Sequence, residues 1–130
     1  MALIVLDASV VIAVTDTNDD LHAASIDALR HHVGDELRLP ASAYAECLVG
    51  PAQRKALDLA RRNIARLGIE VVPIDDRIAV KSAEIRARAR SLRLPDALVL
   101  ACGEVLDADV VLTADRRWTR FARVNVLNAK

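Results

Sequence analysis

The sequence predicts an α/β fold: a central parallel sheet of about five strands with helices on both faces. Short apolar runs alternate along the chain with longer segments of helical periodicity, which is the pattern of strands joined by crossover helices. Apolar residues make up 53% of the chain and aromatic residues only 2%, a composition that suits helices packed on a buried sheet better than a sandwich or a disordered chain. Because 130 residues is the size of one domain, we expect a single unit over residues 1–130.

Five apolar runs are the expected strands. The first, at residues 3–6, has no polar residue, as expected for a strand buried on both faces of a parallel sheet. The other four lie at residues 37–39, 69–74, 110–112 and 124–127. Parallel strands in one sheet need right-handed crossovers, and the intervening segments are long enough to provide them.

The segments between the strands show the apolar spacing of helices. Ser42 is placed to cap a helix that Gly50-Pro51 breaks, and Gly68 is placed to end the next one. Asp75-Asp76 precedes a long helix and offers it a cap. The expected helical segments are residues 10–14, 21–32, 43–49, 52–67, 77–92 and 96–105, with a short turn or helix through Trp118 and Phe121.

Four acidic residues are candidates for the chemistry of the protein. Asp7 follows the first expected strand and Asp115 follows the fourth, at the carboxyl edge where parallel sheets bind ligands. Asp96 opens a helix together with Pro95, and Glu46 lies in the middle of another helix. Each aspartate is equally suited to capping a helix, and a glutamate facing solvent is the ordinary alternative for Glu46.

We expect the four carboxylates to converge at the sheet edge. Such a cluster needs a cation, because close pairs repel by about 4 kcal/mol at an effective dielectric near 20. Oxygen ligands without a nearby His or Cys favour Mg²⁺ or Mn²⁺ over Zn²⁺. Metals held in this way suit phosphodiester hydrolysis, in which one ion activates water and a second, if present, stabilises the leaving oxygen.

The ordered motifs of the chain resemble those of PIN-domain ribonucleases of the VapC kind, the toxins of VapBC toxin–antitoxin pairs. The resemblance spans nearly the whole chain. The matching motifs are Leu6-Asp7-Ala8-Ser9, Ala45-Glu46, Pro95-Asp96-Ala97-Leu98 and Leu112-Thr113-Ala114-Asp115. The resemblance implies a single PIN-like domain with catalytic, metal-binding acids and polar supports. The implied metal ligands are Asp7, Glu46, Asp96 and Asp115, and the implied supports are Ser9 and Thr113.

Two departures from the family pattern stand beside these motifs. The usual Ala-Asp-Ala before the third acid is Pro95-Asp96-Ala97 here, which affects how the helix enters the site. Arg116 and Arg117 follow Asp115, where a further carboxylate sometimes stands in the family. A fifth acidic ligand is therefore not expected.

The resemblance also implies a function and partners: a Mg²⁺- or Mn²⁺-dependent endoribonuclease with an RNA substrate. It further implies a VapB-like antitoxin that blocks the acidic site, and a homodimer or a higher toxin–antitoxin assembly. The two cysteines lie in apolar segments without metal-ligand spacing, and the chain opens without an export segment. No apolar run is long enough to span a bilayer. We therefore expect a cytoplasmic protein with no membrane contact.

The basic residues are candidates for RNA contacts. The net charge is +0, so any attraction to RNA must come from local patches. Arg86, Arg90 and Arg93 recur at i, i+4 and i+7 and are expected along one side of a helix, and Arg116 and Arg117 adjoin Asp115. An ordinary solvated surface is the alternative for all five.

Other activities on similar sheets fit less well. A haloacid-dehalogenase-type phosphatase needs a second Asp two residues after the first, where Ser9 stands, and a phosphotransfer receiver needs a paired acid and a late Lys that are absent. Two alternatives stay open: a non-catalytic PIN-fold module that binds RNA or protein, and a general RNA-processing nuclease without an antitoxin. The RNA target and the number of metal ions are not predicted.

Overall fold

The computed structural model describes residues 1–128 and contains one five-stranded sheet in the order β3-β2-β1-β4-β5. Every pair of neighbouring strands is parallel, which confirms the predicted α/β fold. The strands are β1 (Leu3–Leu6), β2 (Glu36–Pro40), β3 (Ile69–Val72), β4 (Val110–Thr113) and β5 (Val124–Val126).

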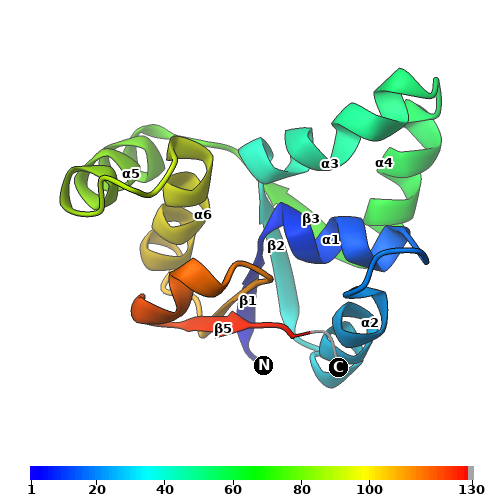
Figure 1. Cartoon of the computed structure of the whole chain (residues 1–130), viewed down its shortest axis with the longest axis horizontal. Helices are drawn as coiled ribbons and strands as arrows, with labels where there is room; N and C mark the ends of the chain where they lie inside the picture. The colour runs from blue at the N-terminus through cyan, green and yellow to red at the C-terminus, as the bar shows by residue number, and fades with distance from the viewer. Residues whose placement is uncertain (129–130) are drawn as a thin grey trace.

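The helices cover both faces of this sheet. The α5–α6 pair lies on one side and α1 with α2 lies on the other, while α3 and α4 extend from the same side as α1 (Figure 1). They are α1 (Ala8–Thr15), α2 (His22–His31), α3 (Ala41–Gln53), α4 (Leu57–Arg66), α5 (Asp76–Arg88) and α6 (Leu94–Val105), with a 3₁₀ helix, η1 (Arg116–Arg120). None of these helices is long and apolar enough to cross a membrane.

The strand order places a topological switch point at β1. The chain moves from β1 outward to β2 and β3, then returns through α5 and α6 to β4 on the opposite side of β1. The connections after β1 and β4 therefore diverge to opposite faces, and they leave a crevice at the carboxyl end of these two strands. Asp7 and Asp115 follow those strand ends.

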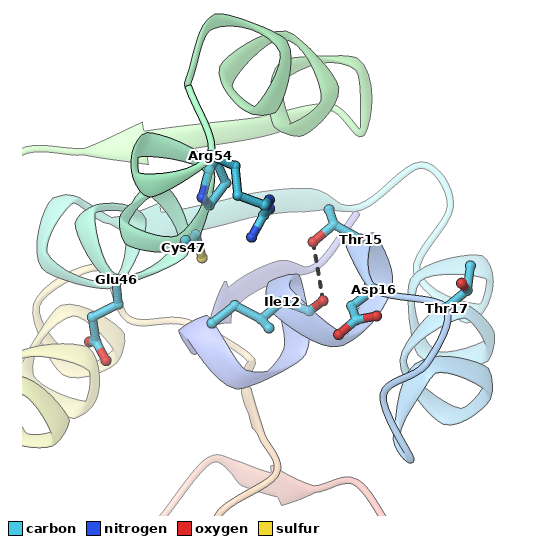
Figure 2. Close-up of a pocket in the computed structure, with 9 residues that line it drawn as sticks. Ile12, Thr15, Asp16, Thr17, Glu46, Cys47 and Arg54 are labelled. Atoms are coloured by element: carbon cyan, nitrogen blue, oxygen red, sulfur yellow. Dashed lines mark hydrogen bonds between the residues drawn. The ribbon is translucent and has the colours of Figure 1, made fainter. Parts of the chain in front are cut away.

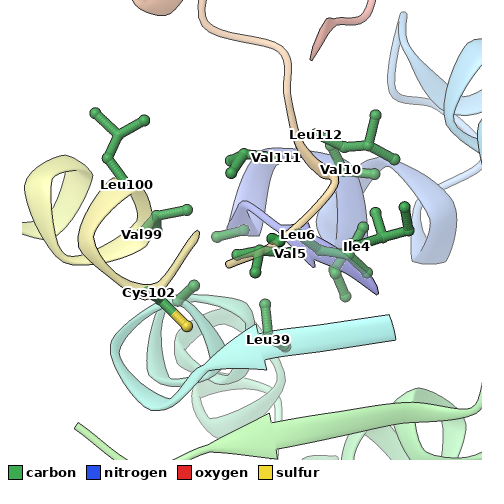
Figure 3. Packing of buried hydrophobic residues seen from close by; sticks show 14 of the residues in the cluster. Ile4, Val5, Leu6, Val10, Leu39, Val99, Leu100, Cys102, Val111 and Leu112 are labelled. Atoms are coloured by element: carbon green, nitrogen blue, oxygen red, sulfur yellow. The ribbon is translucent and has the colours of Figure 1, made fainter. Parts of the chain in front are cut away.

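The core is formed by β1 and its neighbours. Ile4, Val5 and Leu6 are completely buried, which explains their continuous apolar run. Val99 of α6 approaches β1 from one side and Val10 of α1 from the other (Figure 3). The Trp118 side chain is also fully buried.

Two of the expected boundaries around α3 are wrong. The helix begins at Ala41 after Pro40 with no side-chain cap, and the Ser42 hydroxyl is buried without a partner among the described residues. Pro51 does not break the helix, which continues to Gln53. A proline in the last turn removes only one hydrogen bond, so its effect on the helix is small. The predicted end at Gly68 is confirmed by its φ of 76°.

The predicted end of the long helix is also wrong. We expected it to reach residue 92, but α5 ends at Arg88. Leu92 turns into the core, with only 5% of its surface exposed, and its N–H donates to the Ala89 carbonyl. The helical axis cannot continue through that turn, so Arg90 and Arg93 lie outside α5 and do not share a helix side with Arg86.

Candidate active site

Asp7 is fixed at the carboxyl end of β1 by three hydrogen bonds. Its Oδ1 accepts from the Ala8 N–H at 2.9 Å, so Asp7 caps α1. Its Oδ2 accepts from Ser9 Oγ at 2.8 Å and from Thr113 Oγ1 at 2.9 Å. The two hydroxyl residues named from the sequence therefore hold this carboxylate in one orientation.

The same hydroxyls connect the ends of β1 and β4. The Ala114 N–H donates to Ser9 Oγ, and the Asp115 N–H donates to Thr113 Oγ1, both at 3.1 Å. Thr113 is fully buried, so its hydroxyl has no access to bulk water as an alternative partner. This network fixes the position of Asp115 relative to Asp7, although the two lie far apart in sequence.

Asp96 lies in the first turn of α6 and is 9% exposed. The cap position of that helix is Arg93, which makes no side-chain cap bond. The Asp96 Oδ2 atom is buried and has no hydrogen-bond partner within residues 1–128; the nearest cation is Arg93 Nε at 3.7 Å. The structure therefore does not support the capping alternative for Asp96, and it leaves a buried carboxylate oxygen open to a ligand.

Glu46 lies on α3 and lines the same pocket as Asp7 and Asp96. Burial raises the pKa of Glu46, and the charges of Asp7 and Asp96 raise it further. Figure 2 shows its side chain extending from α3 away from Arg54. Glu46 is exposed, but it lines the pocket of the other acids and does not lie on a separate surface.

Asp115 is both a cap and a wall of the pocket. Its Oδ1 accepts from the Arg117 N–H, which caps η1, at 2.9 Å. The Arg117 guanidinium donates through Nη2 to Oδ2 at 2.6 Å and through Nε to Oδ1 at 3.0 Å. These bonds hold the pKa of Asp115 below its usual value, with Arg93 contributing in the same direction.

One pocket of about 410 Å³ is lined by all four acids. Burial raises the pKa of Asp7, the hydroxyls of Ser9 and Thr113 lower it, and the charge of Asp96 raises it. The sequence-predicted acids therefore come together at the carboxyl edge of the sheet, where negative charge accumulates.

The donor set suits a hard divalent cation. No three Asp, Glu, His or Cys side chains in the described part of the chain are grouped tightly enough to hold an ion by themselves. Mg²⁺ usually takes only one or two carboxylates and keeps several waters, so it needs no such group. The buried Oδ2 of Asp96 lacks a donor, and a cation would satisfy it. The residues present fit Mg²⁺ or Mn²⁺.

Of the five arginines predicted to contact RNA, one lines the acidic pocket and the other four do not. Arg93 lines the acidic pocket, and Arg117 is engaged by Asp115. Arg116 is exposed on η1. Arg86 donates to the Arg90 carbonyl, and neither residue lines the pocket.

Sequence reasoning missed an apolar wall of this pocket. Ile12 lines it and is 37% exposed, so an apolar side chain stands beside the acids. The available signal was helical spacing, because Ile12 falls on the turn of α1 after Ser9 and so shares its side of the helix.

The comparisons with known proteins agree on the fold. A family model described as PIN domain matches residues 4–124. A toxin–antitoxin complex from Klebsiella pneumoniae is 19% identical, with a TM-score of 0.78 over 97% of both chains. The sarcin–ricin-loop-cleaving toxin VapC20 from Mycobacterium tuberculosis is 17% identical, with a TM-score of 0.77 over 96% of this chain and 99% of that one.

A third solved structure, VapBC2 from Rickettsia felis bound to a DNA fragment from its promoter, is 11% identical, with a TM-score of 0.74 over 97% of this chain and 99% of that chain. No curated protein matches the sequence significantly. At these identities the structural likeness shows a shared fold.

Proposed function

This chain belongs to the PIN-domain family, and from that premise we propose that it is a Mg²⁺- or Mn²⁺-dependent endoribonuclease and the toxin of a type II toxin–antitoxin pair. The observation that carries the proposal is the pocket at the carboxyl edge of the sheet. Four carboxylates line it, and the buried Asp96 Oδ2 lacks a hydrogen-bond partner among the described residues. Such a pocket repels a phosphodiester unless a cation neutralises it.

The acids of the pocket would bind the cation, and the hydroxyl residues orient one of these acids. Asp7 and Asp96 would hold the cation, with Glu46 and Asp115 beside them. A bound divalent ion supplies an activated water and neutralises charge on the phosphate. Ser9 and Thr113 orient the Asp7 carboxylate through the hydrogen bonds described above.

Arg93 lies at the rim of the site. Its side chain is 71% exposed and lies 3.7 Å from Asp96. An exposed guanidinium binds phosphate oxygens well, so Arg93 would orient the RNA backbone toward the acids. Arg117 is occupied by Asp115 and does not serve this purpose in the structure described here.

The partners follow from the similar proteins. Solved relatives include a toxin–antitoxin complex and VapBC2 bound to promoter DNA, which supports a VapB-like antitoxin for this chain. The Mycobacterium tuberculosis relative is a toxin that cleaves the sarcin–ricin loop, which supports an RNA substrate. A cytoplasmic location and a homodimer belong to the same proposal.

The test is cleavage of end-labelled single-stranded RNA by the purified chain. We expect cleavage with Mg²⁺ or Mn²⁺, none in excess EDTA, and recovery when the ion is restored. Full activity in EDTA would contradict the metal-dependent mechanism and indicate acid–base catalysis without a metal. RNA binding with no cleavage under either ion would instead favour the non-catalytic module.

A second measurement separates a toxin from a processing nuclease. Expression of the chain alone should arrest growth, and the proposal requires a neighbouring gene whose product relieves that arrest on co-expression. Growth arrest that no neighbouring gene product relieves would exclude the toxin–antitoxin assignment while leaving the ribonuclease intact.

A further inference from the structure

A second pocket adjoins the acidic one between α1 and α3. It encloses about 380 Å³ and shares Ile12 and Glu46 with the acidic pocket. Figure 2 shows its other polar side chains on two opposing walls, with Arg54 on one and Thr15 and Asp16 on the other. The two pockets therefore adjoin at Ile12 and Glu46, and an RNA chain bound at the acidic site would pass beside this one.

Arg54 provides hydrogen-bond donors on the first wall of this pocket. It follows the last residue of α3, and within residues 1–128 its guanidinium forms no ion pair. The guanidinium lies against Gly50, where an added Cβ would stand 3.1 Å from Nη1. The absent side chain at Gly50 thus leaves room for the Arg54 head group.

The opposite wall carries the Asp16 carboxylate and the Thr15 hydroxyl. The Thr15 hydroxyl donates to the Ile12 carbonyl at 3.1 Å, so it is fixed to the helix. Asp16 Oδ1 accepts from the Asn18 N–H at 3.0 Å, and its other oxygen points away from that turn with no partner among the residues described. The pocket therefore offers a donor fork on one wall and an acceptor on the other.

We propose that this pocket seats a guanine base of the RNA beside the cleaved phosphodiester, an inference that rests on the proposed ribonuclease function. The pocket has one cation, Arg54, and two carboxylates, Asp16 and Glu46, so it disfavours a phosphate group. Its volume falls within the range of sites that bind small organic groups, and Ile12 and Pro51 offer apolar surface to the face of a base.

Guanine matches the two walls because of its hydrogen-bonding edges. Its O6 and N7 are adjacent acceptors, and arginine binds this pair with two parallel hydrogen bonds. Its N1–H and amino group are adjacent donors. Asp16 can accept from one of them at Oδ2 and from the other at the second acceptor site of Oδ1, whose first site is used by the Asn18 N–H. No other base combines two adjacent acceptors with two adjacent donors, so the Arg54 and Asp16 walls select guanine.

The test measures binding, so that it does not depend on turnover. Single-stranded RNAs that differ only at the base beside the cleaved bond carry guanine, adenine, cytosine, uracil or an abasic site. Their affinities for the Asp96→Asn protein are measured by fluorescence anisotropy. We expect guanine to bind about tenfold tighter than the other bases, since a good bidentate pair gives 1–3 kcal/mol of discrimination.

Three variants test which residues cause the preference for guanine. Arg54→Ala and Asp16→Asn should abolish the guanine preference, and Gly50→Ala should weaken it because the added methyl displaces the Arg54 head group. Arg62→Ala is the matched control, since Arg62 is exposed on neighbouring α4 and lines neither pocket. With the Asp96 side chain intact, Arg62→Ala should hydrolyse both RNA and bis(p-nitrophenyl) phosphate, which has no base, at the parental rate.

Several results would overturn the inference. Equal affinity for all five RNAs would do so, as would an Arg54→Ala variant that loses the same affinity for every base, which would indicate a general charge effect. Unchanged RNA binding with weakened binding of the neighbouring gene's product would assign the pocket to that protein. A parental chain that hydrolyses neither substrate with metal would count against the proposed function itself, whereas the base preference in binding is measured independently.

Discussion

Asp7 and Asp96 face the same pocket, but their surroundings differ. The Asp7 carboxylate receives three hydrogen bonds from Ala8, Ser9 and Thr113, so its position is fixed by the protein. Asp96 is nearly buried, and its Oδ2 receives no hydrogen bond from the described chain. A buried carboxylate without donors is unfavourable. Under the proposed metal-dependent mechanism, Asp7 would be organised before a cation binds, whereas Asp96 would be stabilised by the cation.

The largest expected effect comes from removing the charge at Asp96. Asp96→Asn keeps the shape of the side chain but not the charge that attracts a cation. RNA cleavage should fall at least about a hundredfold, since even residues behind metal ligands are worth 10–100-fold. The melting temperature should hold or rise, because carboxylate repulsion is relieved.

Gel-based cleavage and thermal melts at matched Mg²⁺ measure both effects. Asp58→Asn, on the exposed face of α4, is the control: cleavage should be unchanged, and the melting temperature should fall at most slightly because only an exposed ion pair with Arg61 in the first turn of the helix is lost. An Asp96→Asn protein that cuts RNA at the parental rate would show that Asp96 has no catalytic part.

The second effect is stabilisation by the metal itself. Mg²⁺ should raise the melting temperature of the parent, by the equivalent of about 2.7 kcal/mol at a concentration one hundred times its Kd. The shift should be lost in Asp96→Asn and reversed by EDTA. A shift of equal size in both proteins would place the ion away from Asp96 and remove the contrast with Asp7.

The third effect concerns the support of Asp7. Thr113→Val removes the hydroxyl that donates to Asp7 and accepts from the Asp115 N–H. The variant should lose about 1–3 kcal/mol of unfolding free energy, because a buried acceptor and donor lose their partner. Cleavage should fall less than in Asp96→Asn, since the charge of Asp7 remains.

Thr113→Ser keeps the hydroxyl and should recover most of the lost activity. Urea unfolding and the cleavage rate are measured on both variants. If the valine variant loses stability but keeps full activity, Thr113 supports the fold and does not orient Asp7 for catalysis.

The same contrast explains what the sequence could predict. Asp7 and Asp115 were placed correctly because strand ends meet at one edge of a parallel sheet, a rule that depends only on local order. The runs at residues 3–6 and 110–112 were found because a strand buried on both faces has no polar residue to interrupt it. The other three runs contain Arg38, Glu70 or Asn125 and were found from the apolar residues on either side of them. Local pattern was sufficient wherever a side chain's position follows from its own element.

Local sequence pattern did not predict the features that depend on packing between helices and strands. Pro51 looked like a helix end, but the helix continues past it to Gln53. The end of α5 depends on the burial of Leu92, and the direction of Glu46 depends on where α3 lies relative to α1. The second pocket was not predicted, because Arg54 and Asp16 come together only when α1 and α3 pack.

The smallest expected effect concerns Asp115, which is intermediate between the two cases because its donors come mainly from one side chain, Arg117. Arg117 holds the pKa of Asp115 below its usual value of 3.8 in the folded state. A carboxylate with a lowered folded pKa contributes stability that is present above its unfolded pKa and is lost as pH falls through the folded pKa. Arg117→Gln should therefore unfold at a slightly lower urea concentration than the parent at neutral pH. The two proteins should converge once the pH is low enough to protonate Asp115 in the folded state as well as in the unfolded state. Urea titrations across this range measure the difference, which is small because Arg117 is exposed to solvent and salt screens the pair. A gap between the two proteins that stays constant down to low pH would show that Arg117 acts through packing and not through the charge of Asp115.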